Sequence, residues 1–175
     1  MRSSRAAMWV VGARLLVLAA VTLTVVGLVG HAVGGVWLTT TVGPTAYLLL
    51  AHPEDEASRL RSSLLGHASA TGCGLAALAV FGLWDHPSVA EVHRDSLPQI
   101  AAQALAVGLT LLLLTVLHAH HPPAAATALL ISSGIARPGP PLYGMLAGLA
   151  LLIALAAVLA RIPGAHFERG SRNGG

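Results

Sequence analysis

Residues 118–134 read HAHHPPAAATALLISSG, a histidine cluster followed by a proline pair and a short apolar run. Proline has a preset φ and no amide hydrogen, so Pro122 and Pro123 suit the first turn of a helix far better than its interior. The stretch therefore predicts a short helix from Pro122 to about Ser133. The first backbone amides of such a helix have no helical partners, and they can bind an anion.

The composition around this stretch is that of a membrane protein. The 175 residues are 55% hydrophobic and only 10% charged, and the mean hydropathy is +0.74, outside the range of ordinary soluble domains. A membrane-crossing helix needs about 20 apolar residues. Four stretches meet this length: Ala6–Gly30, Leu64–Trp84, Leu97–Leu117 and Leu142–Ala160. The first is too long for a signal peptide, so we interpret it as a transmembrane helix.

The charges favour membrane insertion over nucleic-acid binding. All ten basic residues are arginines, and they are spread over loops and ends without a dense run, so no nucleic-acid surface is expected. Arginine without lysine, together with abundant alanine, glycine and leucine, is typical of GC-rich bacterial genomes. We therefore expect an integral protein of the bacterial inner membrane.

A second short helix is predicted near Gly43-Pro44-Thr45. The neighbouring threonines can cap its N-terminus, and Pro53 ends it. Its seven to ten residues are too few to cross a bilayer alone at about 1.5 Å per residue.

A shift of 82 residues superimposes the two short helices. It places residues 43–49 on residues 125–131 and Gly66 on Gly148. The order long, short, long occurs twice, and three elements per half make the second half inverted. The predicted fold is an all-α polytopic membrane helical bundle of two inverted three-element repeats, with short or broken second and fifth helices.

This interpretation divides the chain into five parts. They are an N-terminal cytoplasmic tail (1–8), a first transmembrane repeat (9–84), a linker loop (85–96), a second transmembrane repeat (97–161) and a disordered C-terminal tail (162–175). Six crossings with both termini cytoplasmic leave only Arg94 and Arg137 outside. Short helices that dip in and return would put more arginines outside, so the positive-inside rule favours six crossings.

Inverted repeats with short helices often bring two helix N-termini together near the bilayer centre. Here they would bring Gly43, Pro44 and Thr45 toward Pro122, Pro123 and Thr127. Unpaired amides, the helix dipoles and two hydroxyl donors would form a pocket for a small anion. The alternative is that proline and glycine only end helices, while each threonine bonds its own backbone.

Two motifs, residues 121–129 and a block between residues 43 and 67, resemble motifs of the HPP family of integral membrane proteins. His121-Pro122-Pro123 followed by residues 124–129 is similar to the tripeptide that names the family. Residues 43–49, Pro53, Arg61, Gly66 and His67 resemble its Gly-x-x-Ala-x-Leu-Leu, Pro and Arg-Asn-x-x-x-Gly-His block. The resemblance runs from about residue 35 to 160, with Ala125, Ser62 and Leu60 in place of the usual glycine, asparagine and proline.

The resemblance implies a small multi-pass protein, with nitrite transport described for some members. We therefore predict a transporter or channel for a small inorganic anion in the lipid bilayer, without enzymatic chemistry and without a cofactor. His121 is included in the site on this resemblance. A membrane region this small is also expected to form a homo-oligomer.

Three further polar residues are candidates for the pathway. Arg61 can attract anions to the cytoplasmic mouth or simply anchor its helix at the interface. His67, one turn inside the third element, can couple proton to anion movement or hydrogen-bond a neighbouring helix. Gln103, four residues after Gln99, can line a pore or bridge helices.

A rival function is a metal or haem site. Imidazole is a common metal ligand, and His31, His67, His118 and His121 can supply it from a helical bundle. The sequence puts no carboxylate or cysteine beside the histidine cluster, so we expect no bound metal. A packing subunit of a larger membrane complex is a third possibility.

Overall fold

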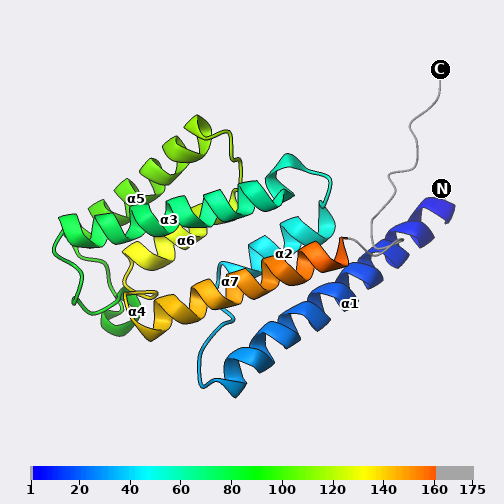
Figure 1. Ribbon diagram of the computed structural model, residues 1–175, viewed down its shortest axis with the longest axis horizontal. Helices are drawn as coiled ribbons and strands as arrows, with labels where there is room; N and C mark the ends of the chain where they lie inside the picture. The colour runs from blue at the N-terminus through cyan, green and yellow to red at the C-terminus, as the bar shows by residue number, and fades with distance from the viewer. Residues whose placement is uncertain (1, 161–175) are drawn as a thin grey trace.

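The computed structural model describes residues 2–160, and these form a helical bundle (Figure 1). The elements in chain order are α1 (Arg2–Ala32), α2 (Val42–Ala51), the 3-10 helix η1 (Glu56–Ser58), α3 (Leu60–Val80), α4 (Val89–Val92), α5 (Leu97–Val116), α6 (Pro123–Ser132) and α7 (Pro140–Leu159).

The predicted helical membrane bundle is confirmed. α1, α3, α5 and α7 are each long and apolar enough to cross a bilayer, while α2 and α6 are short apolar helices of ten residues. α1 begins at Arg2, so most of the segment interpreted as an N-terminal tail is helix. The predicted C-terminal tail lies outside the described residues.

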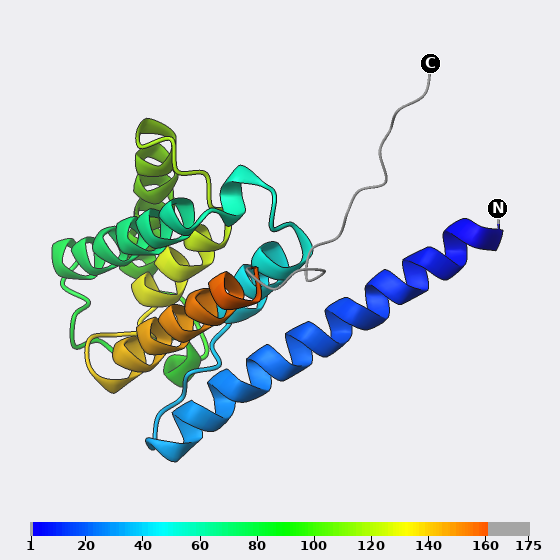
Figure 2. The ribbon, with the colours of Figure 1, turned by 45° about the vertical axis from the view of Figure 1, so that its right-hand side comes forward.

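The helices form two groups that mix the halves of the chain (Figures 1 and 2). α3 packs against α5 and α6, whereas α7 packs against α1 and α2. The last helix of each half therefore contacts the first two elements of the other half. α1 lies along α7 at the edge of the bundle, and its N-terminal end extends beyond the other helices in both views.

Glycines let each of these exchanged helices approach a non-helical segment closely. A Cβ atom on Gly144 of α7 would lie 2.6 Å from the Val36 carbonyl oxygen, and Gly148 faces the Trp37 carbonyl in the same way. A Cβ atom on Gly66 of α3 would lie 2.8 Å from the Cβ of His121. Small residues permit such close packing of membrane helices.

The two short helices begin differently from the prediction. Thr41 is the N-cap of α2, but it has φ −79° and ψ −25° and makes no side-chain cap bond. A capping threonine needs an extended backbone to reach the N2 or N3 amide, so the predicted threonine cap is wrong. α6 begins one residue later than expected, at Pro123.

The segment predicted as a linker loop contains the short helix α4. Ser88 and Glu91 form a capping box at its start. The Val89 amide donates to the Ser133 carbonyl after α6 at 3.1 Å, and Arg137 lies 3.6 Å from the Glu91 carboxylate. The loop before α5 and the loop after α6 are thus joined at one end of the bundle.

Candidate functional site

Four buried polar side chains meet where α2, α3 and α6 come together, and we name Thr45, His67, His121 and Thr127 the histidine–threonine cluster. His67 lies at its centre: its Nδ1 is 2.8 Å from Thr127 Oγ1, and its Nε2 is 3.3 Å from Thr45 Oγ1. The His121 Nε2 lies 3.1 Å from His67 Nε2. Each of the four is at most 5% exposed.

Three helices and one loop position these groups. Thr45 and Thr127 each lie about one turn inside a short helix, α2 and α6 respectively. His67 lies in the second turn of α3. His121 precedes α6 and packs against Gly66, where any larger side chain would displace it.

Hydrogen-bond partners that can only accept determine the proton positions in the neutral cluster. The Ala57 carbonyl lies 2.8 Å from His121 Nδ1, so Nδ1 carries the hydrogen and His121 Nε2 accepts. The Thr45 hydroxyl donates to the Thr41 carbonyl at 2.8 Å, so Thr45 Oγ1 accepts from His67. Both facts place the hydrogen of His67 on Nε2.

The remaining bond follows from this assignment. A neutral imidazole with its hydrogen on Nε2 accepts at Nδ1, so the Thr127 hydroxyl donates to His67. The cluster is a directed chain that runs from Thr127 through His67 and His121 to the carbonyl of Ala57, just before α3.

The structure brings together Thr45 and Thr127, the two threonines that the repeat aligned, and places His67 and His121 between them. Neither hydroxyl hydrogen is free, however. Thr45 bonds the backbone of its own helix, which was the alternative weighed from the sequence, and Thr127 bonds His67. The predicted pair of free hydroxyl donors is therefore wrong for this conformation.

The residues that begin the short helices do not all join the cluster. Gly43, Pro44 and Pro122 are exposed, whereas Pro123 is buried in the first turn of α6. The amides of α6 are also partly paired, because Ala124 bonds the carbonyl of His121 at 3.0 Å. The short helices contribute Thr45 and Thr127, which lie about one turn inside them.

Arg61 and Gln103 lie outside the cluster. The Arg61 guanidinium is exposed and donates to the carbonyls of Leu117 and His118 at 3.3 and 3.5 Å, at the C-terminal end of α5. Gln103 donates to Asp95 at 2.8 Å, toward the other end of α5. At 1.5 Å per residue, Gln103 lies about 20 Å along the helix from the carbonyls that Arg61 contacts. The structure does not bring Gln103 to the cluster.

The four histidines of the rival metal site do not converge. His31 and His118 are exposed, and only His67 and His121 meet. Among the described residues, no group of three or more histidine, cysteine, aspartate or glutamate side chains is placed to hold a metal ion.

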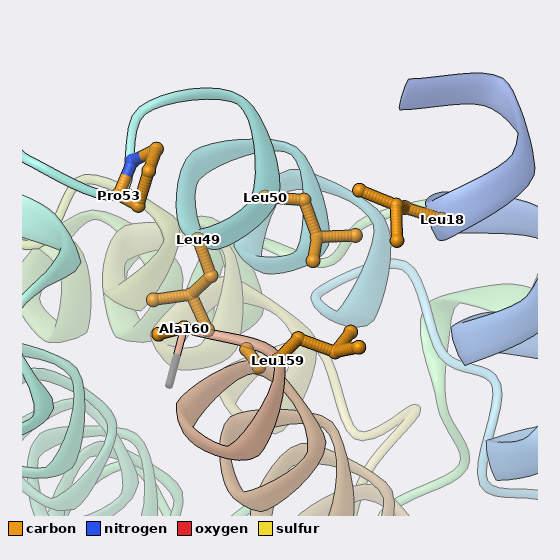
Figure 3. A pocket seen from close by; sticks show the side chains of 7 residues that line it. Leu18, Leu49, Leu50, Pro53, Leu159 and Ala160 are labelled. Atoms are coloured by element: carbon orange, nitrogen blue, oxygen red, sulfur yellow. The ribbon is translucent and has the colours of Figure 1, made fainter. Parts of the chain in front are cut away.

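A separate apolar pocket lies between the middle of α1 and the C-terminal ends of α2 and α7 (Figure 3). Its lining residues are Leu18, Leu49, Leu50, Pro53, Ala156, Leu159 and Ala160. The side chains seen in Figure 3 are aliphatic, so the pocket offers hydrocarbon contact and not the polar contacts of the cluster.

A known protein family matches this chain. The family described as "HPP, transmembrane region" matches residues 3–168, nearly the whole chain. The chain belongs to the HPP family. No curated protein and no solved structure matches it. The family match confirms the resemblance drawn from the tripeptide at residues 121–123 and from the block at residues 43–67.

Sequence reasoning missed three groups that support the histidine–threonine cluster of this HPP protein. The carbonyls of Thr41 and Ala57 fix its hydrogen-bond directions, and Ser63 Oγ lies 3.4 Å from His121 Nδ1. Ser63 lies four residues before His67 on α3, and this helical spacing was a usable signal. The two carbonyls gave no sequence signal, because every residue has a backbone carbonyl.

Proposed function

We propose that this HPP protein carries a small inorganic anion, nitrite or one like it, across the bacterial inner membrane, and that the anion binds at His67 and Thr127. The observation that supports this most is the burial of two histidines among threonines inside an apolar bundle. Polar and ionisable groups within a membrane are costly, and they commonly mark a substrate path. The proposal involves no covalent chemistry.

The arrangement of the short helices supports a path through the bundle. α2 and α6 both reach the cluster, each after a non-helical segment, and transporters commonly place broken helices at the substrate site. The exchange of α3 and α7 between the two halves is what two inverted repeats related by a pseudo-two-fold axis would give. We include that symmetry in the proposal.

The loop contacts support six crossings. Val89 bonds Ser133, and Glu91 pairs with Arg137, so the loop before α5 lies beside the loop after α6. If α6 dipped in and returned, these two loops would lie on opposite sides of the membrane. A ten-residue helix rises about 15 Å, and the non-helical residues before it add to the length of the crossing.

Purified protein in liposomes tests the transport proposal directly. Uptake of nitrite, nitrate, formate and chloride is measured with and without a pH gradient, against empty liposomes. We expect uptake of at least one anion above the empty-liposome rate. If folded protein moves none of the four under either condition, anion transport is wrong.

Thr127→Val tests the binding residue. The change removes the hydroxyl at nearly constant volume, so anion affinity is expected to fall about 10-fold, the cost of one lost hydrogen bond. Thr127→Ser keeps the hydroxyl and is expected to retain affinity. Thr115→Val, on the exposed face of α5, is the matched control. Equal affinity in Thr127→Val and the wild type would remove Thr127 from the site.

The proposal also includes a homo-oligomer. Exposed apolar residues along α5, among them Leu105, Leu109 and Leu112, can face lipid or a second copy. Native mass spectrometry from lipid particles distinguishes the two cases.

A further inference from the structure

We propose that His67 is the proton-binding residue of the anion site, and that a proton and an anion bind there together. This inference rests on the proposed transport function and specifies its coupling ion. It follows from the geometry of the histidine–threonine cluster, in which one imidazole contacts both threonines and a second imidazole.

In the neutral cluster, Nδ1 of His67 is the atom that can take up a proton. Its Nε2 already carries a hydrogen, which is directed at Thr45 Oγ1 and His121 Nε2. The His121 Nδ1 hydrogen is held by the Ala57 carbonyl, so the acceptor of that ring faces His67. The lone pair on His67 Nδ1 faces the Thr127 hydroxyl at 2.8 Å.

Proton uptake reverses the bond between Thr127 and His67. A hydronium ion transfers its proton to His67 Nδ1, a new N–H bond forms, and water is released. The Thr127 oxygen then accepts from Nδ1–H, because an imidazolium ring only donates. The Thr127 hydroxyl hydrogen is released from His67 and can donate to an anion.

The same proton supplies the charge that the anion needs. An isolated charge is costly in a buried apolar setting, and an ion pair lowers that cost when hydrogen bonds satisfy it. An imidazolium without an anion, or an anion without the imidazolium, would remain uncompensated. Binding of each therefore favours binding of the other, and this linkage is reciprocal.

Apart from the buried Cys73, the other titratable groups of the elements around His67 are paired or exposed. In the η1 loop, Asp55 lies 3.8 Å from His52 and Glu56 lies 3.8 Å from Arg59, all at the surface. Among the described residues, His121 is the titratable group that contacts His67. The others on the neighbouring elements are Tyr47 on α2, the exposed Glu54, Arg61 and buried Cys73 on α3, His118 and His120 before α6, and Tyr143 on α7.

Proton uptake on anion binding is the decisive measurement. Nitrite is titrated calorimetrically into the purified protein in buffers of different ionisation enthalpy, which gives the number of protons taken up for each anion bound. We expect net uptake in the wild type and none in His67→Gln, which keeps a polar side chain without a titratable ring. The exposed His86→Gln is the matched control and is expected to behave as the wild type.

Liposomes loaded with a pH-sensitive dye give the corresponding transport result. An inward nitrite gradient is expected to acidify the interior faster than in empty liposomes, and an inward proton gradient is expected to raise nitrite uptake about 5-fold or more, the lower end of usual coupling between two sites. His67→Gln is expected to abolish both effects. Size-exclusion elution and thermal unfolding verify that the variant is folded.

The outcomes separate the two proposals. Anion uptake that ignores the pH gradient, with no protons taken up on binding, overturns the coupling and leaves anion transport standing. Proton uptake that persists in folded His67→Gln also overturns the assignment. If His67→Gln does not fold, nitrogen NMR of labelled histidine in the wild type decides: an imidazolium signal that fails to appear with added nitrite overturns the proposal.

Discussion

At the scale of single residues, the absence of a side chain at Gly66 leaves the room that His121 occupies. A Cβ atom there would lie 2.8 Å from the Cβ of His121, and neither atom can move without shifting backbone. Gly66→Ala is therefore expected to destabilise the protein by about 1–3 kcal/mol, the usual cost of overpacking, and to lower anion uptake by displacing His121 from His67. Thermal unfolding and liposome uptake measure the two effects.

Gly72→Ala is the control for that change. Gly72 lies on the same helix, and an added Cβ meets nothing within 4 Å. Alanine favours a helix over glycine by about 1 kcal/mol, so this variant is expected to be as stable as the wild type or more so. Equal stability and uptake in both alanine variants would contradict the packing role of Gly66.

The sequence predicted part of the cluster and not its hydrogen bonds. The 82-residue shift aligned Thr45 with Thr127, and the family resemblance added His67 and His121. The directions of their bonds depend on carbonyl groups of Thr41 and Ala57. Because Ala57 is 64 residues from His121, its role required the three-dimensional fold.

At the scale of elements, the loop before α5 is held to the loop after α6 through Glu91. Its carboxylate accepts from the Ser88 amide at 2.6 Å, and Arg137 lies 3.6 Å away. The hydrogen bonds from Ser88, assisted by Arg137, lower the pKa of Glu91 below its usual value. The group therefore stabilises α4 above the pKa of the unfolded chain, and this stabilisation is lost as the pH falls through the lowered folded pKa.

Hydrogen exchange of the α4 amides across acid pH tests this effect. We expect local protection, after correction for the intrinsic pH dependence of exchange, to fall in the wild type below the ordinary glutamate range. Glu91→Gln is expected to show weak protection with little further pH dependence. Asp85→Asn, at an exposed position of the same loop, should retain the wild-type profile. A pH-independent α4 in the wild type would contradict the role of Glu91.

The long and short apolar helices could be predicted because their lengths and prolines determine them. The observed bounds of α5 agree with the predicted bounds within one residue, and α2 ends before Pro53 as expected. α4 was missed, although Ser88 and Glu91 have the spacing of a capping box. A four-residue helix carries too little apolar periodicity to stand out within a polar loop.

At the scale of the whole molecule, the exchange of α3 and α7 places the histidine–threonine cluster where the two halves meet. Thr45 and His67 come from the first half, and His121 and Thr127 come from the second. A site shared in this way changes whenever one half moves against the other, which is how repeat-based transporters alternate access. The order of long and short elements suggested two halves. Only the fold shows that the last long helix of each half packs against the first two elements of the other.

The proposed six-crossing arrangement predicts which loops face each side of the membrane. The one native cysteine, Cys73, is buried, so a Cys73→Ser chain can carry single new cysteines for labelling in intact cells. Glu54→Cys and His120→Cys should react only after the membrane is made permeable, whereas Asp85→Cys and Arg137→Cys should react from outside. Re-entrant short helices would instead bring Glu54→Cys and His120→Cys to the outside and Asp85→Cys to the inside. Because Asp85 and Arg137 belong to loops that contact each other through Glu91, labelling of these two positions from opposite sides would contradict both the topology and the contact that supports it.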